Sequence, residues 1–483
     1  MTRRFISVLL ILFFFCLFTS FAESRQDEAH RYYVVGPVYE GFTWVIQADE
    51  NVADPWEEGT IYIIDIYGNQ LTDGTLKVSN RYFSEGLVTV WKDEKAGCID
   101  TKGNEVIPFA FHDIDDFTEF GLACASIKEQ ESAERWGVID RQGQWVIPAE
   151  WDGAKFLNPG DGCEPLVNVQ REHQSGFMNL AGETMLPCEY TVSFFAQFHD
   201  KRLQVKREGE GYGYVNELGE LVIPCQWTYA GDFSEGLARV LDEKKSGFID
   251  TDGNLALSLP EGWYTRDAFH EGLALVENDQ GLFGFIDHTG TLAIPCQWGK
   301  AESFSEGVAR VWEDGKCGFI DTAGKIVTPC QWKNARAAQG GYIIIQDFSG
   351  RWGILDLAGT LTVPCVYTEI NFIEQGVFCM ADVIDGHTLY GLIRGDGTVL
   401  CPCRWSLVSF FSDDGLIEVT LEPDGMADSD VWNVQKTTCG FITLSGEIAV
   451  PCEYDIGYYS NGYFTLIRDG YLTILDREGN ILF

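Results

Sequence analysis

The chain has 483 residues, and its 34 basic and 73 acidic side chains give a formal net charge of −39. Such a surface repels nucleic acid and anionic lipid, so it excludes nucleic-acid binding and favours cationic, neutral or metal-bridged partners. Hydrophobic residues make up 45% of the sequence and aromatic residues 13%, which supplies a packed core and excludes a disordered chain.

The first 22 residues have the pattern of a secretory signal peptide. Arg3 and Arg4 precede an apolar run, Phe5–Phe18, and small residues flank Phe21 at the expected cleavage site after Ala22. The run is shorter than the ~20 residues that a membrane span needs. We therefore expect a signal peptide at 1–22 and a mature chain at 23–483. That chain would have no membrane span and would be secreted or located in the cell envelope.

The rest of the chain repeats one pattern. The segment FSEGLARVLDEKKSGFIDTDGNLALS (Phe233–Ser258) returns as FSEGVARVWEDGKCGFIDTAGKIVTP (Phe304–Pro329). The turn glycine of this pattern recurs at Gly68, Gly103, Gly143, Gly182, Gly219, Gly253, Gly290, Gly324, Gly359, Gly397, Gly446 and Gly479. This spacing predicts about twelve units of roughly 36 residues, the signature of a repeat architecture.

Each unit is expected to be β-structure. Short runs such as LARVL, GFID and LVIP are rich in aliphatic and aromatic residues and are separated by Gly, Asn and Asp turns, as in antiparallel hairpins. The following CQW could form a fourth short strand. No stretch has 3.6-residue periodicity, so helix should be scarce. One hairpin cannot bury its apolar face alone, whereas stacked copies can.

The array could be a ring or a rod. The unit is close in size to a propeller blade, but twelve units exceed the 4–8 blades of a usual ring. Two rings, one unusually large ring and an open superhelical stack of hairpins are the possibilities. We expect a β-propeller-like array, with an open β-hairpin solenoid as the alternative. The last unit lacks a rear strand, and the segment Arg31–Gly41 resembles one. This predicts that the N-terminal strand completes the last blade and protects its edge.

The units resemble the bacterial WG-repeat family, also called KWG repeats. Two segments match the family pattern well: FSEGLVTVWKDEKAGCIDTKGNEVIPFAF (Phe83–Phe111) and ERWGVIDRQGQWVIPAEW (Glu134–Trp151). The eponymous tryptophan is present at Trp136 and Trp352. Other residues replace it at Ala96, Tyr212, Ser246, Phe283, Cys317, Tyr390 and Cys439. The resemblance implies a repeat architecture and an interaction role, and it implies no activity.

Cysteines recur in the repeat. Seven of them follow the proline of the rear strand: Cys188, Cys225, Cys296, Cys330, Cys365, Cys403 and Cys452. Phe109 and Ala149 occupy the same place in two other units, which predicts a buried apolar slot for a structural thiol. Some disulfides are the alternative, because secretion permits them. The close pair Cys401 and Cys403 lacks the ligand spacing of a zinc site.

The repeated acidic residues are interpreted as scaffold. An active site is one place, so its residues should be singular, whereas these acids recur from unit to unit and would cap turns with their side-chain oxygens. One set lies in the F-x-E-G turn: Glu85, Glu235, Glu271 and Glu306. The other lies in the next hairpin: Asp65, Asp100, Asp140, Asp250, Asp287, Asp321, Asp356 and Asp476. The seven histidines show no metal-binding spacing.

One insertion interrupts the pattern, at Glu422–Thr438, with three aspartates and Trp432. It is either a tolerated surface loop or a calcium- or partner-binding loop. The sequence predicts no catalytic, cofactor-binding or metal-binding residue and no cofactor. The leading hypothesis is a non-catalytic scaffold that binds an unidentified protein or glycan. A propeller-type glycan hydrolase and a calcium-stabilised structural protein are the alternatives.

Overall fold

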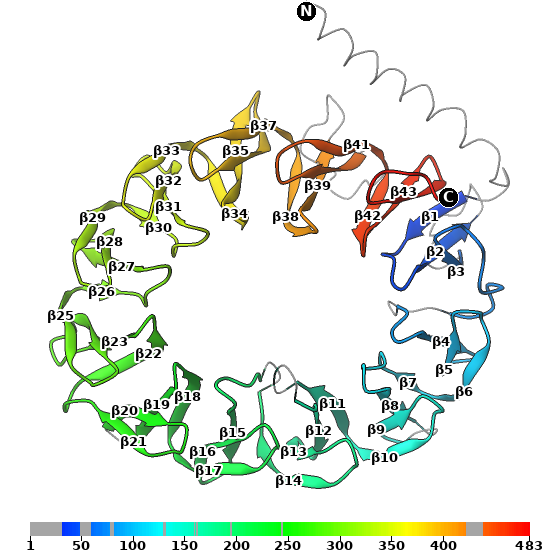
Figure 1. Ribbon diagram of the computed structural model, residues 1–483, viewed down its shortest axis with the longest axis horizontal. Coiled ribbons are helices and arrows are strands. Elements are labelled where there is room, and N and C mark those ends of the chain that lie inside the picture. Colours follow the sequence, from blue (N-terminus) through cyan, green and yellow to red (C-terminus); the bar gives the residue numbers. More distant parts are fainter. Residues whose placement is uncertain are drawn as a thin grey trace, which may run out of the picture.

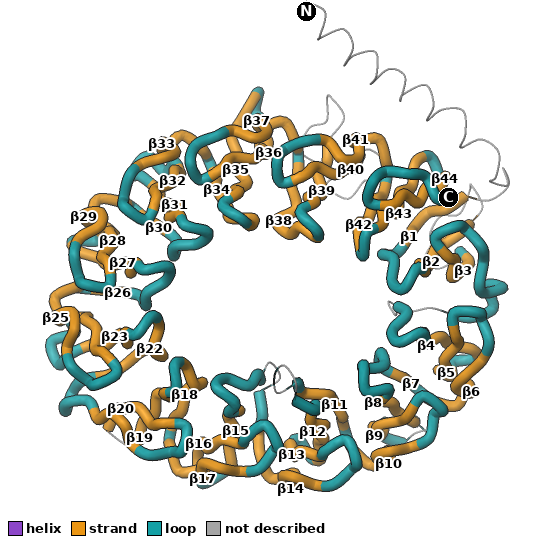
Figure 2. The backbone as a smooth tube through the Cα atoms, viewed as in Figure 1, coloured by secondary structure: helices purple, strands orange, loops and turns teal. Residues whose placement is uncertain are grey.

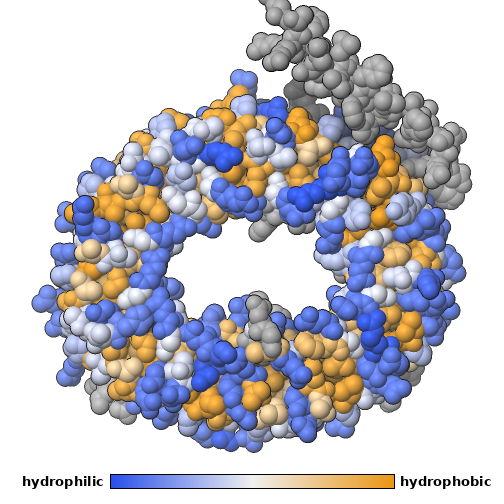
Figure 3. All heavy atoms as spheres, viewed as in Figure 1, coloured by the Kyte–Doolittle hydropathy of each residue, from blue (hydrophilic) through white to orange (hydrophobic). Residues whose placement is uncertain are grey.

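The computed structural model describes residues 31–48, 59–77, 82–128, 132–158, 160, 163–193, 196–242, 245–421 and 438–483. The expected signal peptide and residues 422–437 of the insertion lie outside this part of the chain. The described residues are all-β, and they form twelve blades around a wide central opening (Figures 1 and 2). The space-filling view shows that the opening passes through the ring and that its wall is mainly hydrophilic (Figure 3).

The strands of blades 1–6 follow in chain order. Blade 1 has β1 (Arg31–Val35), β2 (Phe42–Ala48) and β3 (Thr60–Asp65), and blade 2 has β4 (Leu87–Lys92), β5 (Lys95–Asp100) and β6 (Glu105–Phe111). Blade 3 has β7 (Asp113–Ile114), β8 (Leu122–Ile127), β9 (Arg135–Asp140) and β10 (Trp145–Trp151), and blade 4 has β11 (Gly153–Leu157), β12 (Leu166–Arg171), β13 (Gln174–Met178) and β14 (Thr184–Thr191). Blade 5 has β15 (Leu203–Arg207), β16 (Gly211–Val215) and β17 (Leu221–Trp227), and blade 6 has β18 (Tyr229–Ser234), β19 (Leu237–Asp242), β20 (Lys245–Asp250) and β21 (Leu255–Ser258).

Blades 7–12 complete the ring. Blade 7 has β22 (Tyr264–His270), β23 (Leu273–Glu277), β24 (Phe283–Asp287) and β25 (Leu292–Trp298), and blade 8 has β26 (Lys300–Ala301), β27 (Val308–Glu313), β28 (Lys316–Asp321) and β29 (Ile326–Trp332). Blade 9 has β30 (Asn334–Ala335), β31 (Tyr342–Gln346), β32 (Trp352–Asp356) and β33 (Leu361–Tyr367), and blade 10 has β34 (Glu369–Glu374), β35 (Val377–Ile384), β36 (His387–Arg394) and β37 (Val399–Trp405). Blade 11 has β38 (Leu407–Asp413), β39 (Leu416–Leu421), β40 (Thr438–Thr443) and β41 (Ile448–Tyr454), and blade 12 has β42 (Ile456–Ser460), β43 (Tyr463–Arg468) and β44 (Tyr471–Asp476).

A complete blade is an antiparallel meander whose first strand lines the opening and whose fourth strand forms the outer rim (Figure 1). The prediction of a separate CQW strand is wrong. Those residues continue the rear strand, as in β25, where the register shifts around the proline. The additional strand of a four-stranded blade is the inner one, which precedes the F-x-E-G turn and can be as short as the two residues of β26. Proline on the outermost strand cannot donate a hydrogen bond, which protects that exposed edge from pairing with another chain.

The glycine of the WG motif allows the outer strand to cross closely over the third strand. A Cβ atom on Gly318 would lie 2.6 Å from the carbonyl oxygen of Thr328, and one on Gly353 would lie 2.5 Å from that of Val363. Real Cβ atoms do not approach carbonyl oxygens this closely. The crossing therefore requires glycine, whereas the residue before it can vary.

The apolar core lies between neighbouring blades. The phenylalanine of each F-x-E-G turn packs on an aromatic ring of the preceding blade, as in Phe304 on Phe285 at 4.8 Å and Phe269 on Phe248 at 4.8 Å between ring centroids. Each blade thus buries its apolar face only against a neighbour, which is the physical reason for the repetition.

The ring closes between blade 12 and blade 1. The prediction that the N-terminal strand joins the last blade is wrong, because β1 pairs with β2 of its own blade. Instead, the Ser460 hydroxyl donates to the carbonyl oxygen of Val38 at 3.1 Å. The same contact joins internal neighbours, as from Ser234 to the carbonyl of Phe269 at 2.7 Å. The closing junction is therefore built like the internal ones.

Candidate functional site

The repeated aspartates stabilise their own turns, as predicted. Asp250 Oδ1 accepts hydrogen bonds from the backbone N–H groups of Asp252 at 3.0 Å and Asn254 at 2.8 Å. The Asn254 side chain donates to Oδ2 of the same carboxylate. These hydrogen bonds, the one from the Asn254 side chain above all, lower the pKa of Asp250. Such carboxylates are already occupied by turn formation.

The repeated glutamates act differently from the prediction. Glu85 places its carboxylate 3.9 Å from the guanidinium of Arg141 in the next blade. The other three do not cap their own turn, because each carboxylate reaches the next blade and accepts the N–H of the glycine in its turn. We call this contact the inter-blade carboxylate bond. It joins Glu235 to Gly272 at 3.0 Å and Glu271 to Gly307 at 2.8 Å. The further examples are Glu40 to Gly86, Asp200 to Gly236, and Glu306 to both Gly340 and Gly341.

The cysteines are free thiols within the described residues. Of the seven that follow proline, Cys225 is buried and the others are half-buried, so the predicted slot is less enclosed than expected. Burial raises the pKa of Cys98 to about 11 and that of Cys124 to about 12. Thiols with such pKa values are poor nucleophiles at neutral pH. In the described part of the chain, no group of three or more His, Cys, Asp or Glu side chains is placed to hold a metal ion.

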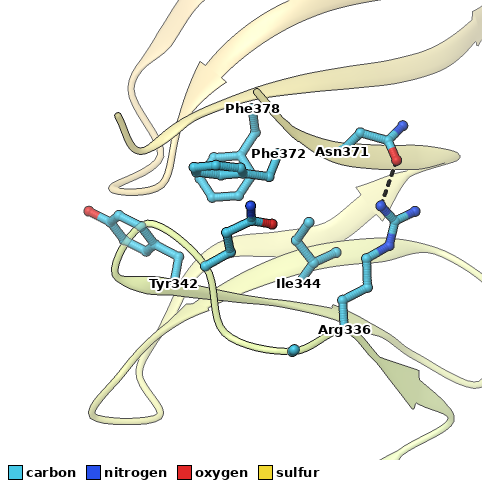
Figure 4. A pocket seen from close by; sticks show the side chains of 8 residues that line it. Arg336, Tyr342, Ile344, Asn371, Phe372 and Phe378 are labelled. Atoms are coloured by element: carbon cyan, nitrogen blue, oxygen red, sulfur yellow. Dashed lines mark hydrogen bonds between the residues drawn. The ribbon is translucent and has the colours of Figure 1, made fainter. Parts of the chain in front are cut away.

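One hollow lies between blades 9 and 10, at the inner edge of the ring. This inner-wall pocket has a volume of about 230 Å³. Its lining residues are Arg336, Ala337, Gln339, Tyr342, Ile344, Asn371, Phe372 and Phe378. The side chains of Phe378 and Ile344 are buried and form an apolar floor, whereas Arg336 and Gln339 are exposed at the rim. Arg336 and Tyr342 lie at opposite ends, with the two phenyl rings between them (Figure 4).

The aromatic wall of this pocket replaces the regular inter-blade carboxylate bond. Blade 9 has Gly340 where blade 8 has Glu306. A Cβ atom on Gly340 would lie 2.4 Å from the ring of Phe372, so the ring occupies the space of the missing side chain. In the same way, a Cβ atom on Gly395 would lie 2.4 Å from the ring of Tyr342. Both rings depend on these glycines for their positions.

Arg336 is held in place by two neighbours. Its Nη1 donates to Oδ1 of Asn371 at 2.6 Å, and its guanidinium lies 5.3 Å from the ring centroid of Trp352. Asn371 is fixed in turn, because its Nδ2 donates to Glu369 Oε1 at 2.7 Å. The pocket therefore presents an oriented cation beside an apolar floor.

The WG-containing repeat model matches residues 97–129, 136–159, 212–245, 283–317, 318–347 and 352–381. The chain belongs to the WG-repeat family. A search of curated proteins finds no match. The inner-wall pocket is built from the last two of these matched segments. In this WG-repeat protein, the ring of the motif tryptophan Trp352 packs against the guanidinium of Arg336.

Among solved structures, the WG-repeat chain is similar to the tricorn protease, with 10% identity and a TM-score of 0.26 over 92% of this chain and 57% of that one. It is also similar to Hsv2 of Kluyveromyces lactis, with 8% identity and a TM-score of 0.27 over 60% of this chain and 98% of that one. A third is the β-propeller domain of the Trilobed protease from Pyrococcus furiosus, with 12% identity and a TM-score of 0.23 over 53% of this chain and 94% of that one. The chain thus spans little more than half of the tricorn protease. These scores are too low to inform its function.

A second hollow of about 650 Å³ lies over the turns of blades 10–12. Glu374 and Asp414 line it, together with Arg477. Asp414 is already engaged, because Arg477 lies 3.6 Å from its carboxylate and Tyr459 Oη donates to it at 3.0 Å. We call this the turn-face hollow.

Sequence reasoning did not find either hollow. A signal was available, because the F-x-E-G turn becomes Ala338–Gly341 in blade 9 and loses both phenylalanine and glutamate. For membrane association, the described residues hold no helix with the length and apolar character to cross a bilayer.

Proposed function

We propose that the ring is a non-catalytic scaffold, secreted or located in the cell envelope, that binds a protein or glycan partner at its inner wall. The observation that carries this proposal is the inner-wall pocket. Its apolar floor and oriented polar rim have the composition of small-ligand sites. Its lining contains no Asp, Glu, His, Cys, Ser or Lys, and Tyr342 is its one side chain of a type that serves as general acid, base or nucleophile, so it offers no acid–base pair.

The position of the pocket supports binding rather than packing. Its side chains depart from the repeat, and the rim residues are exposed at the opening. A residue that serves only the fold should recur in most blades. Singular residues at one junction are better explained by a ligand that contacts that junction.

The test is capture of a partner from cell-envelope extract and from a glycan panel by the immobilised chain. We expect saturable binding that Phe372→Ala weakens at least tenfold. Phe348→Ala is the matched control, because Phe348 is 61% exposed in a turn of the adjacent blade 9 and does not line the pocket. A separate deletion of Glu422–Thr438 tests the insertion. Saturable binding that Phe372→Ala leaves unchanged would contradict the proposed site.

One observation favours the glycan hydrolase as a second candidate. Glu374 and Asp414 are two carboxylates that line the same turn-face hollow, and Glu374 takes the place of Ser305 in blade 8. Glycosidases use such pairs as acid, base or nucleophile. Hydrolysis of a glycoside substrate, lost in both Glu374→Gln and Asp414→Asn, would support this candidate. Hydrolysis that survives both substitutions would exclude this hollow as the active site.

A further inference from the structure

The charge of the inner-wall pocket is reversed relative to the neighbouring blade. In blade 8, Glu302 directly follows the inner strand β26, and its carboxylate accepts a hydrogen bond from Arg310 Nε at 3.0 Å. The residues at the same repeat positions in blade 9 are Arg336 and Ile344, each 34 residues later. The inner position has changed from acid to base, and its former partner has become apolar. This exchange places a cation at the opening and an apolar surface behind it.

Arg336 has no carboxylate partner among the described residues, although acidic residues outnumber basic ones by about two to one. Other arginines of the ring do pair with acids, as Arg351 does with Asp382 at 2.9 Å and Arg266 with Glu277 at 2.7 Å. A guanidinium has five N–H donors, and Asn371 accepts from one of them. The remaining donors can bind an external carboxylate, for which the guanidinium has matching bidentate geometry.

The polar groups of the pocket are too few for a neutral sugar. Each polar atom of Asn371 already has one partner, because Oδ1 accepts from Arg336 and Nδ2 donates to Glu369. Arg336, the Gln339 amide and the Tyr342 hydroxyl remain, and Tyr342 lies at the end opposite Arg336 (Figure 4). Several sugar hydroxyls would stay unpaired over the apolar floor, at a cost in free energy. An apolar group would bury well against Phe372 and Phe378.

We propose that the inner-wall pocket binds a carboxylate carried on an apolar group, as at the C-terminus of a peptide that ends in an apolar residue. The carboxylate pairs with Arg336, and the apolar group contacts the phenyl rings. This inference rests on the proposed binding function and names its ligand class. The same chemistry occurs in free N-acylated amino acids, so the experiment must separate the two sources.

The probe is a fluorescein-labelled hexapeptide that ends in phenylalanine, with either a free carboxylate or a C-terminal amide. Fluorescence anisotropy measures its binding to the full chain, and unlabelled N-acetylphenylalanine competes as the free acid. We expect the carboxylate peptide to bind at least about tenfold more tightly than the amide, as a charge-assisted pair implies. Competition by N-acetylphenylalanine at equal concentration would identify the free acid as sufficient. Competition only at much higher concentration would identify the peptide.

Three variants make the outcome decisive. Arg336→Gln should abolish the preference for the carboxylate, and Phe372→Ala should weaken both peptides. Arg171→Gln is the matched control, because Arg171 also lies over a tryptophan ring, Trp151 at 4.4 Å, at a different junction. Its binding should equal that of the unmodified chain, and thermal melting should confirm that all variants are folded.

The failures of the two proposals differ. Equal binding of acid and amide, both weakened by Phe372→Ala, would overturn the ligand class and leave the pocket as a binding site. Capture of a neutral glycan that depends on Phe372 would also overturn the ligand class while leaving the pocket as a binding site. If neither peptide binds and no envelope component depends on Phe372, the proposed function at this pocket fails as well.

Discussion

Two arcs of the ring differ in how their blades are joined. From blade 5 to blade 9, each junction has the inter-blade carboxylate bond, from Asp200, Glu235, Glu271 and Glu306. From blade 9 to blade 12, the same turn position is occupied by Gly340, Gln375, Asp414 and Asn461. Both hollows lie in this second arc. The first arc keeps the residues that join its blades, whereas in the described part of the second arc this position makes no bond to a glycine N–H of the next blade.

The largest effect should come from a feature that both arcs share. Gly318→Ala in blade 8 and Gly353→Ala in blade 9 each place a methyl group against a carbonyl oxygen of the outer strand. We expect each to lower the free energy of unfolding by about 3 kcal/mol, the upper range for overpacking. Urea unfolding monitored by circular dichroism measures this. A cost below about 1 kcal/mol in either blade would show that the outer strand can move away.

The second prediction converts one arc into the other. Gly340→Glu restores the residue of blade 8 but collides with Phe372, so we expect a loss of about 1–3 kcal/mol. Adding Phe372→Ser introduces the residue that blade 8 has at Ser303 and removes the collision. The double variant should be more stable than Gly340→Glu alone and should lose ligand binding. Equal melting temperatures for the single and double variants would contradict the view that Phe372 displaced the carboxylate.

The third prediction compares one turn position in the two arcs. Glu306→Ala removes the acceptor of two backbone N–H groups, each at 2.8 Å, and should cost about 1–2 kcal/mol. Gln375→Ala is the control, because Gln375 has a similar positive φ, 48° against 51°, and makes no side-chain hydrogen bond among the described residues. Its cost should stay within about 0.5 kcal/mol. Similar losses in thermal melts of both variants would assign the effect to backbone strain.

Much of the regular arc could be predicted from the sequence. The spacing of the turn glycines gave twelve β-units, and the aspartates were correctly assigned to their own turns. In blade 8 the inner strand was missed because β26 has only two residues, too few for an alternating pattern. The role of Glu235 was also missed. Its partner belongs to the next blade, and a single unit read by itself does not contain that contact.

The pocket arc could be predicted only in part. The loss of the F-x-E-G pattern at Ala338–Gly341 was visible, but its consequence depends on Phe372, more than 30 residues later. Glycine at position 340 looks like an ordinary turn residue until the ring that fills its side-chain space is known. The most conspicuous departure in the sequence is instead the insertion at Glu422–Thr438, which is the longest interruption of the repeat. Short exchanges at a junction can matter more than long loops, because two neighbouring blades contribute to each one.

The smallest effect concerns the turn aspartates of the regular arc. Hydrogen bonds to Asp250, first the one from Asn254, lower its pKa in the folded chain. The stabilisation it gives is therefore present above the unfolded pKa of about 3.9 and is lost as the pH falls through the lower folded value. Asp250→Asn should keep the turn, because Asn216 Oδ1 accepts the same two N–H groups in blade 5, at 2.9 Å from Glu220 and 3.0 Å from Leu218. Thermal melts from pH 6 to pH 3 should show a smaller acid-induced decrease in this variant than in the unmodified chain. A steeper decrease would mean that the charge of Asp250 does not stabilise the folded turn, and that the acceptor geometry shared with Asn216 is what the repeat requires.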